Sequence, residues 1–422
     1  MYTIPIILIF IAGYLAITLE HPLKIGKTAT ALLMAVILWT FYTLGSGDMH
    51  LSSEKLAENL ADVSQILFFL LGAMTIVEMI DAHKGFSAII RWISTKNKVT
   101  LLWIVGFGTF FMSSMLDNLT SSIVMVTLLR KLLDDKKERM VFASIVIIAA
   151  NAGGAWTPIG DVTTTMLWIG ERITSWNIMK SLFIPSVIAL VVPLVVQSFL
   201  IKGRINVSDN HIEKHGATEP YGKLILFMGI GSLIFVPVFK SITHLPPFMG
   251  ILLGVGLMWL VTDIIHSSHS ERQHLRISHA LTRIDISSVL FFLGILLAVG
   301  SLQSAGILKE LAAGLDNMTS DKRIIIYIIG LLSAVVDNVP LVAAGMGMYD
   351  ISLYPVDNSL WEMLAFCAGT GGSVLIIGSA AGVVVMGMEK IEFFWYAKRI
   401  SLNALIGYSA GFLAYILMFP VK

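Results

Sequence analysis

Cysteine and charge are scarce in this chain of 422 residues. The one cysteine, Cys367, cannot form an internal disulfide, and its apolar surroundings favour a buried packing role. Charged residues make up 14% of the chain, against roughly 25% in soluble domains. The formal net charge of +1, without a basic block, argues against a nucleic-acid partner. The amino-terminal segment lacks the basic start and cleavage site of a signal peptide, so we interpret it as a first membrane span.

Apolar sequence is what the chain has in abundance, because 56% of its residues are hydrophobic. Runs of about 17 to 22 apolar residues recur from end to end, which predicts an all-α polytopic membrane protein surrounded by the lipid bilayer. We expect about ten transmembrane spans. Their predicted ranges are Thr3 to Leu19, Thr28 to Leu44, Val63 to Ile80, Arg139 to Trp168, Lys180 to Ile201, Lys223 to Lys240, Phe248 to Ile265, Ile286 to Gln303, Trp361 to Met388 and Phe394 to Met418.

Two apolar segments contain an Asp-Asn pair at their centre. Residues 99–133 surround Asp117 and Asn118, and residues 322–349 surround Asp337 and Asn338. The arms on either side of each pair are short for a hydrocarbon core of ~30 Å, so the sequence predicts two re-entrant hairpins with the pairs at their tips. A carboxylate at bilayer depth costs at least ~2.5 kcal/mol, which marks these acids as functional candidates.

Two further segments, residues 139–170 and 361–389, are predicted to be interrupted helices. They contain NAGGAWTPIGD, from Asn151 to Asp161, and GTGGSVLIIGSAAG, from Gly369 to Gly382. Glycine pairs and Pro158 break the helical ladder and free carbonyl groups, which together with hydroxyls and carboxylates can replace the water around a small cation. The alternative is that these glycines serve close helix packing and the hydroxyls bond their own backbone.

The two halves of the chain repeat each other. Corresponding features are Phe69-Leu70-Leu71-Gly72 and Phe291-Phe292-Leu293-Gly294, Ser113 and Ser333, the two Asp-Asn pairs, Gly153-Gly154 and Gly371-Gly372, Gly160 and Gly378, and Glu171 and Glu389. Each half has an odd number of crossings, so we expect inverted repeats, 1–201 and 223–422, joined by a cytoplasmic linker, 202–222. With the amino terminus outside, 21 of the 29 Lys and Arg residues lie inside, as the positive-inside rule expects.

The repeats predict two cation sites. The first combines Asp117, Asn118, Thr120, Asn151, Thr157, Asp161 and Thr163. The second combines Asp337, Asn338, Thr370, Ser373 and Ser379. The sodium ligands expected foremost are Asp117, Asn118, Asp161 and Asp337. Inverted repeats with broken helices are the plan of secondary transporters, which use no resident cofactor.

These motifs resemble those of NhaD-type sodium/proton antiporters of the ion-transporter superfamily. The resemblance runs from about Leu67 to about Glu389 and implies exchange of sodium or lithium for protons, a homodimer and the bacterial inner membrane. It carries functional roles onto Ser113, Asp117, Asn118, Thr120, Asn151, Asp161, Thr163 and Asp337. Pro340 stands where the first repeat has Thr120, which leaves the second site short of one ligand. The same superfamily includes sodium-coupled carboxylate carriers and arsenite permeases, and these stay as alternatives.

Asp161 is the acid that we expect to couple protons to sodium, because its repeat partner is the uncharged Ser379. Burial disfavours the charged carboxylate and bound sodium favours it, which is the linkage that an antiporter needs. The alternative role is a cap on the half-helix after Gly160. An intramembrane hydrolase would need a nucleophile with a base or a zinc-binding set, and neither is found at the predicted midplane, so we expect no enzyme.

Four other segments admit two interpretations each. Glu78 and Asp81 form a proton antechamber or a solvated helix end. The run from His266 to His279 senses pH or is a solvated inside loop. The amphipathic stretches Lys84 to Lys98 and Ser304 to Met318 link moving and static parts, or simply lie on the lipid surface.

Overall fold

A computed structural model describes residues 3–18, 24–85, 95, 97–201, 203, 219–267, 270–319 and 321–420. All the regular elements in these residues are helices, which confirms the all-α prediction. The first half comprises α1 (Thr3–Thr18), α3 (Lys27–Ser46), α4 (Met49–Ala82), α6 (Lys98–Leu116), α7 (Asn118–Leu132), α8 (Lys136–Gly154), α9 (Val162–Ile169) and α10 (Ser175–Leu200). Most of the predicted linker, 202–222, and most of the stretch from Lys84 to Lys98 lie outside the described residues.

The second half begins at α11 and has more described elements than the first. It comprises α11 (Gly222–Thr243), α12 (Pro247–His266), η2 (Ser270–Leu275), α13 (Ile277–Ala280), η3 (Leu281–Arg283), α14 (Ile286–Ser304), α15 (Ile307–Met318), α16 (Lys322–Leu332), α17 (Asn338–Met348), α18 (Ser359–Gly371), α19 (Ala380–Glu389), α20 (Phe393–Arg399) and α21 (Ser401–Met418). Helix α15 occupies most of the predicted amphipathic stretch and packs against α14 and α17.

Eight of the described helices are long and apolar enough to cross a membrane, so the chain is a multi-pass membrane protein. The predicted third span, Val63 to Ile80, lies within α4, which has 34 residues and begins well before the span. The first turns of α4 contain Glu54, Lys55 and Glu58, so hydropathy does not mark them as part of an apolar run. Helix α6 has 19 residues and is itself a candidate span, so the re-entrant nature of the first hairpin stays a prediction.

Each predicted hairpin and each predicted interruption appears as a pair of helices with a break between them. Helices α6 and α7 meet at Asp117, and α16 and α17 are separated by a turn that ends at Asp337. The other two pairs are α8 with α9 and α18 with α19. The breaks therefore fall at the motifs that the sequence singled out.

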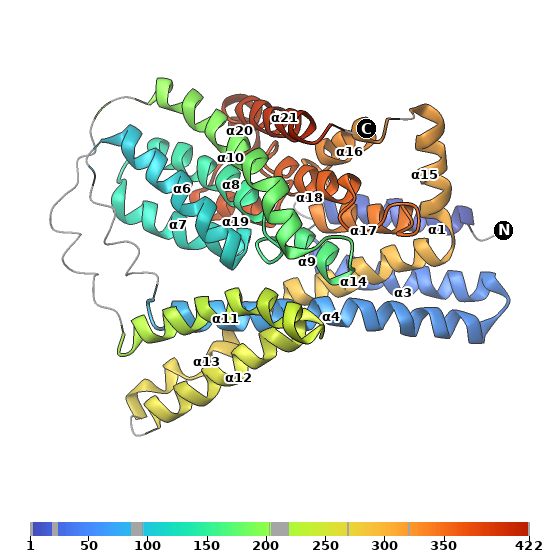
Figure 1. The fold of residues 1–422 in the computed structure, drawn as a ribbon, viewed down its shortest axis with the longest axis horizontal. Coiled ribbons are helices and arrows are strands. Elements are labelled where there is room, and N and C mark those ends of the chain that lie inside the picture. Colours follow the sequence, from blue (N-terminus) through green and yellow to red (C-terminus); the bar gives the residue numbers. More distant parts are fainter. Residues whose placement is uncertain are drawn as a thin grey trace.

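The two halves interlock through equivalent helices. Helix α3 packs against α14 and its counterpart α12 packs against α4, while α10 packs against α21. The broken helices cross over in the same way, because α19 contacts α7 and α9 contacts α17. In Figure 1, α4, α11 and α12 lie in the lower part of the view, with most of the hairpins and broken helices above them. The interruptions are thus surrounded by protein.

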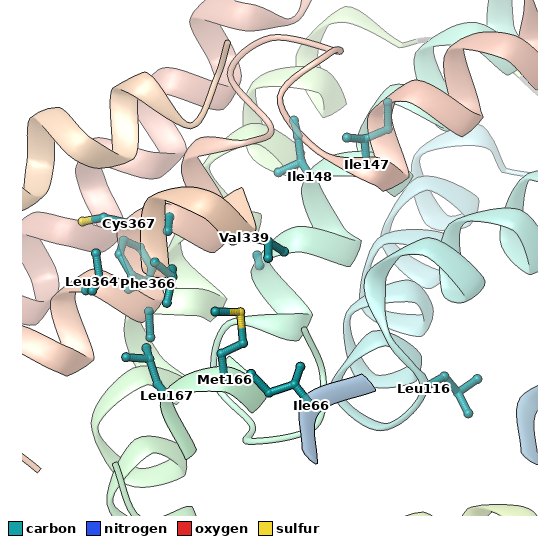
Figure 2. Packing of buried hydrophobic residues seen from close by; sticks show 14 of the residues in the cluster. Ile66, Leu116, Ile147, Ile148, Met166, Leu167, Val339, Leu364, Phe366 and Cys367 are labelled. Carbon is teal, nitrogen blue, oxygen red and sulfur yellow. The ribbon is translucent and has the colours of Figure 1, made fainter. Parts of the chain in front are cut away.

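The core between these layers is apolar. Figure 2 shows Met166 and Leu167 of α9 near Ile66 of α4 and Val339 of α17, with Phe366 and its neighbours on α18 beside them. Cys367 is fully buried there, as its apolar surroundings predicted. In a membrane protein, van der Waals packing of this kind holds helices together, and here it surrounds the broken helices α9 and α18.

Candidate functional site

Four short helices begin at one polar cluster. Their N-caps are Asp117 for α7, Asp161 for α9, Asp337 for α17 and Ser379 for α19, and each cap oxygen accepts a hydrogen bond from a backbone N–H of its own helix. The helices that precede them, α6, α8, α16 and α18, end at the same breaks. Helix N-termini carry partial positive charge and C-termini carry free carbonyls, so the cluster offers partners for both a carboxylate and a cation.

Asp161 is the centre of this cluster and is only 2% exposed. Its Oδ2 accepts hydrogen bonds from Asn118 Nδ2 at 2.7 Å and from Asn338 Nδ2 at 3.3 Å. Its Oδ1 accepts a bond from the backbone N–H of Thr163 at 3.0 Å. The two Asp-Asn hairpins therefore both reach the same carboxylate, one from each half of the chain.

Asn151 joins the two halves a second time and is fully buried. Its Oδ1 accepts a bond from Asn118 Nδ2 at 3.1 Å, and its Nδ2 donates to Ser373 Oγ and Ser379 Oγ, both at 2.9 Å. The polar network, defined here as Asn118, Asn151, Asp161, Asn338, Ser373 and Ser379, is thus continuous across the repeats. Two separate sites were predicted; the structure brings members of both into one network.

Asp117 and Asp337 differ in backbone conformation although they occupy equivalent positions. Asp117 has φ 118° and ψ 160°, a region that only glycine enters readily, whereas Asp337 has φ −50° and ψ 138°. The Asp117 carboxylate accepts bonds from Thr120 N at 2.7 Å and from Thr120 Oγ1 at 2.9 Å. Strain of this kind gathers at functional sites, which supports a role for the first hairpin tip.

The framework around the network is built twice with the same contacts. Ser113 Oγ donates to the carbonyl of Ala150 at 2.6 Å, and Ser333 Oγ donates to that of Ala368 at 2.7 Å. At Gly153 a Cβ would collide with the backbone of the preceding hairpin, and the same holds at its repeat partner Gly371. The glycine pairs therefore permit close approach between hairpin and broken helix, as the packing interpretation proposed.

Three predicted hydroxyl ligands have different surroundings. Thr157 Oγ1 donates to the carbonyl of Ser114 at 2.6 Å, and Thr370 Oγ1 donates to that of Phe366 in its own helix at 2.5 Å. Thr163 Oγ1 is buried beside the Asp161 carboxylate without a hydrogen bond of good geometry among the described residues, and the backbone N–H of Thr163 donates to the same carboxylate. Of the three, Thr163 has the oxygen that is available to a cation.

Comparisons with known proteins agree with this architecture. A family model described as "Citrate transporter" matches residues 7–361. Sodium/proton antiporter 1 of Arabidopsis thaliana is 53% identical over 97% of this chain and 71% of its own length, and sodium/proton antiporter 2 of that plant is 51% identical over 97% and 98%. The Na(+)/H(+) antiporter NhaD of Vibrio cholerae is 29% identical over 98% of this chain and 91% of its own.

The chain belongs to the NhaD-type sodium/proton antiporter family. The resemblance that the motifs indicated is confirmed, and the protein is a transporter. In this NhaD-type chain, the residues that carry the resemblance at Asn118, Asn151 and Asp161 lie in the polar network. The roles of individual residues in cation binding stay a prediction.

A buried histidine pair was missed by sequence reasoning. His83 Nε2 lies 3.0 Å from His266 Nε2, and both residues are fully buried at the adjoining ends of α4 and α12. The interpretation of the run from His266 as a solvated loop is wrong at its start, because η2 and α13 fold over this end and bury Leu275 and Ile277. Glu78, one turn earlier on α4, forms a partly exposed ion pair with Arg283 at 3.3 Å, which favours the solvated helix end.

An ion-pair cluster around a buried glutamate was missed as well. Glu389, at the end of α19, contacts Arg130 of α7 and Arg139 of α8, each at 2.7 Å. The repeat alignment paired Glu389 with Glu171, but Glu171 is exposed. The cluster joins the consecutive helices α7 and α8 to α19 of the other half of the chain, and no local pattern signals that contact.

Proposed function

We propose that the protein exchanges sodium or lithium for protons and that Asp161 is the carboxylate for which the two cations compete. The supporting observation is a buried acid that receives hydrogen bonds from both repeats. Burying a charge without compensation is costly, so this carboxylate is stable only when donors, a proton or a metal cation neutralise it. One carboxylate that accepts either cation, but not both, gives exchange.

The amides of Asn118 and Asn338 act as the adjustable part of the site. With the carboxylate ionised, their NH₂ groups donate to Oδ2, and rotation of either amide turns its oxygen toward the same place. A sodium ion at Asp161 then has the carboxylate, the amide oxygens and the Thr163 hydroxyl as ligands. A proton at Asp161 removes the negative charge, and the sodium ion leaves.

A sodium-coupled carboxylate carrier is the second candidate, favoured by the description of the matching family model. Four helix N-termini at the network would suit an anion. However, the hydrogen bonds of the network in the described chain come from amides and backbone N–H groups, with no Lys or Arg donor, and Asp161 repels a second carboxylate. Antiport is therefore the better fit.

The membrane and the assembly belong to the same proposal. The resemblance implies the bacterial inner membrane, whereas two of the most similar relatives come from a plant, which makes a plant-cell membrane the second candidate. The homodimer is likewise implied by the resemblance. Sodium or lithium and protons are cargo, and the proposal includes no resident cofactor.

Purified protein in liposomes with an internal pH-sensitive dye tests the function. Addition of sodium or lithium chloride outside should move protons out of the liposomes. Potassium chloride should have no effect. Sodium citrate should give the same proton signal as sodium chloride, and labelled citrate should stay outside. Uptake of citrate with no sodium-driven proton movement would contradict antiport and support the carboxylate carrier.

A further inference from the structure

Helices α7, α8 and α19 are joined at both of their ends. At one end, Asn118, Asn151 and Ser379 meet through hydrogen bonds of 3.1 Å and 2.9 Å in the polar network. At the other end, the three helices meet again in the ion-pair cluster that Glu389 centres. Each helix thus has one terminus at the candidate cation site and one at the cluster.

Glu389 is the residue that joins both arginines at the far end. Its side chain is 1% exposed, and its two oxygens divide between the arginines: Oε1 accepts from Arg130 Nε and Oε2 from Arg139 Nε, both at 2.7 Å. The arginines also bond backbone, since Arg130 Nη2 donates to the carbonyl of Met388 and Arg139 Nη1 to that of Leu133 at 2.8 Å. These bonds satisfy carbonyls at the ends of α19 and α7.

The three helical spans between the two ends are similar in length. At 1.5 Å per residue, about 18 Å separates Asn118 from Arg130 along α7, and about 18 Å separates Arg139 from Asn151 along α8. The span from Ser379 to Glu389 along α19 is about 15 Å. Because the three helices are joined at both ends, a change in their spacing at the ion-pair cluster also changes their spacing at the polar network.

We propose that Glu389 is a positioning residue for the cation site. Through its two arginines it holds α7, α8 and α19 at the spacing that the polar network needs. The transport test of this proposal rests on the proposed function, sodium/proton exchange at Asp161. A site of this kind works only when its ligands stay within about 0.5 Å of their places, so loosening the far end weakens sodium binding before it affects the later steps of transport.

The first repeat offers a matched comparison, because its equivalent of Glu389 makes no such cluster. Glu171 is exposed at the end of α9, and the described ion pairs do not include it. Near this end, the link between distant parts of the chain is an exposed one. The Asp357 carboxylate accepts hydrogen bonds from Thr174 N at 2.6 Å and from Thr174 Oγ1 at 2.8 Å. The same substitution at Glu171 therefore removes a glutamate without removing a buried contact.

The transport test compares Glu389→Gln with Glu171→Gln in liposomes. We expect Glu389→Gln to raise the sodium KM roughly tenfold while Vmax changes by less than about twofold, because ligand spacing is lost but Asp161 remains. Glu389→Asp keeps the charge with a shorter reach and should fall between. Trp39→Phe, which removes a partly buried bond to the carbonyl of Leu297 at 2.9 Å, controls for lost stability. An unchanged sodium KM in Glu389→Gln would overturn the proposal. So would changes in KM and Vmax equal to those of Trp39→Phe.

A second measurement is independent of transport. Hydrogen–deuterium exchange of the purified protein in detergent should accelerate at the first turns of α7 and α19 in Glu389→Gln, and should not in Trp39→Phe. Faster exchange limited to the cluster end of these helices would refute the positioning role. If the unmodified protein moves no protons in response to sodium, the proposed function fails. The hydrogen–deuterium exchange rates alone then decide the role of Glu389.

Discussion

Replacing Asp117 by glycine should remove exchange but keep the fold, whereas alanine at the same place should destabilise it. The difference follows from the backbone at the hairpin tip, where φ is 118° and ψ is 160°. A side chain in such a region costs ~1–3 kcal/mol, and glycine escapes that cost while alanine does not. Both variants lose the carboxylate, so they separate backbone strain from chemistry.

The magnitude can be worked out from the contacts of Asp117. The lost cap, in which Thr120 N donates to Oδ1 at 2.7 Å, costs ~1 kcal/mol with alanine and a few tenths with glycine. Glycine also lowers the free energy of unfolding by ~0.4–1 kcal/mol, because it raises the entropy of the unfolded chain. With the strain relief, Asp117→Gly should be more stable than Asp117→Ala by about 1–3 kcal/mol. At Asp337, where φ is −50°, the two substitutions should agree to within ~0.5 kcal/mol.

Thermal unfolding of the four variants in detergent, followed by circular dichroism, gives the order of stability. Proton movement in liposomes gives the activity, which both Asp117 variants should lose. If Asp117→Ala proves as stable as Asp117→Gly, the strained conformation contributes nothing and the reasoning is wrong. If either Asp117 variant exchanges sodium at a near-native rate, the carboxylate is a structural cap only.

Three further predictions concern pH, packing and topology. Burial lowers the pKa of His83 in the folded protein, so His83 in the unfolded chain is protonated at a higher pH and the free energy of unfolding falls as the pH drops below ~6.5. His83→Gln should reduce this loss, as measured by comparing unfolding temperatures at about pH 5.5 and 7.5. Gly371→Ala should abolish exchange and reduce the yield of folded protein in size-exclusion chromatography, because its Cβ meets the hairpin backbone. In a Cys367→Ala background, a cysteine at Glu54 should react with an impermeant reagent from outside and one at Lys136 only from inside; the reverse at Lys136 would remove the re-entrant assignment.

The breaks in the helices could be predicted from the sequence because their causes are local. Asp117 and Asp337 sit between apolar arms, and the glycine pairs stand where α8 and α18 end, with Pro158 following the first of them. Repetition of these signals in the same order also predicted the pairing of Ser113 with Ser333, whose hydroxyls make equivalent bonds. Local causes thus account for the elements and for their order.

Contacts between distant helices could not be predicted in the same way. Hydropathy marks α4 only where it is apolar, so its polar first turns were missed. The convergence of Asn118 and Asn338 on one carboxylate depends on how the two repeats interlock, which residue spacing does not contain. The pairing of His83 with His266 and the burial of Glu389 have the same origin, since each partner alone reads as an ordinary polar residue near a helix end.

Proton release on sodium binding tests the role of Asp161 most directly. Purified protein in weakly buffered detergent solution, with a pH indicator, should release protons when sodium chloride is added and should not when potassium chloride is added. Asp161→Asn and Asp161→Ser should both abolish the release, although the serine copies Ser379 of the second repeat and keeps an oxygen to cap α9. Sodium-dependent proton release that persists in folded Asp161→Ser would contradict the account and reduce Asp161 to a helix cap.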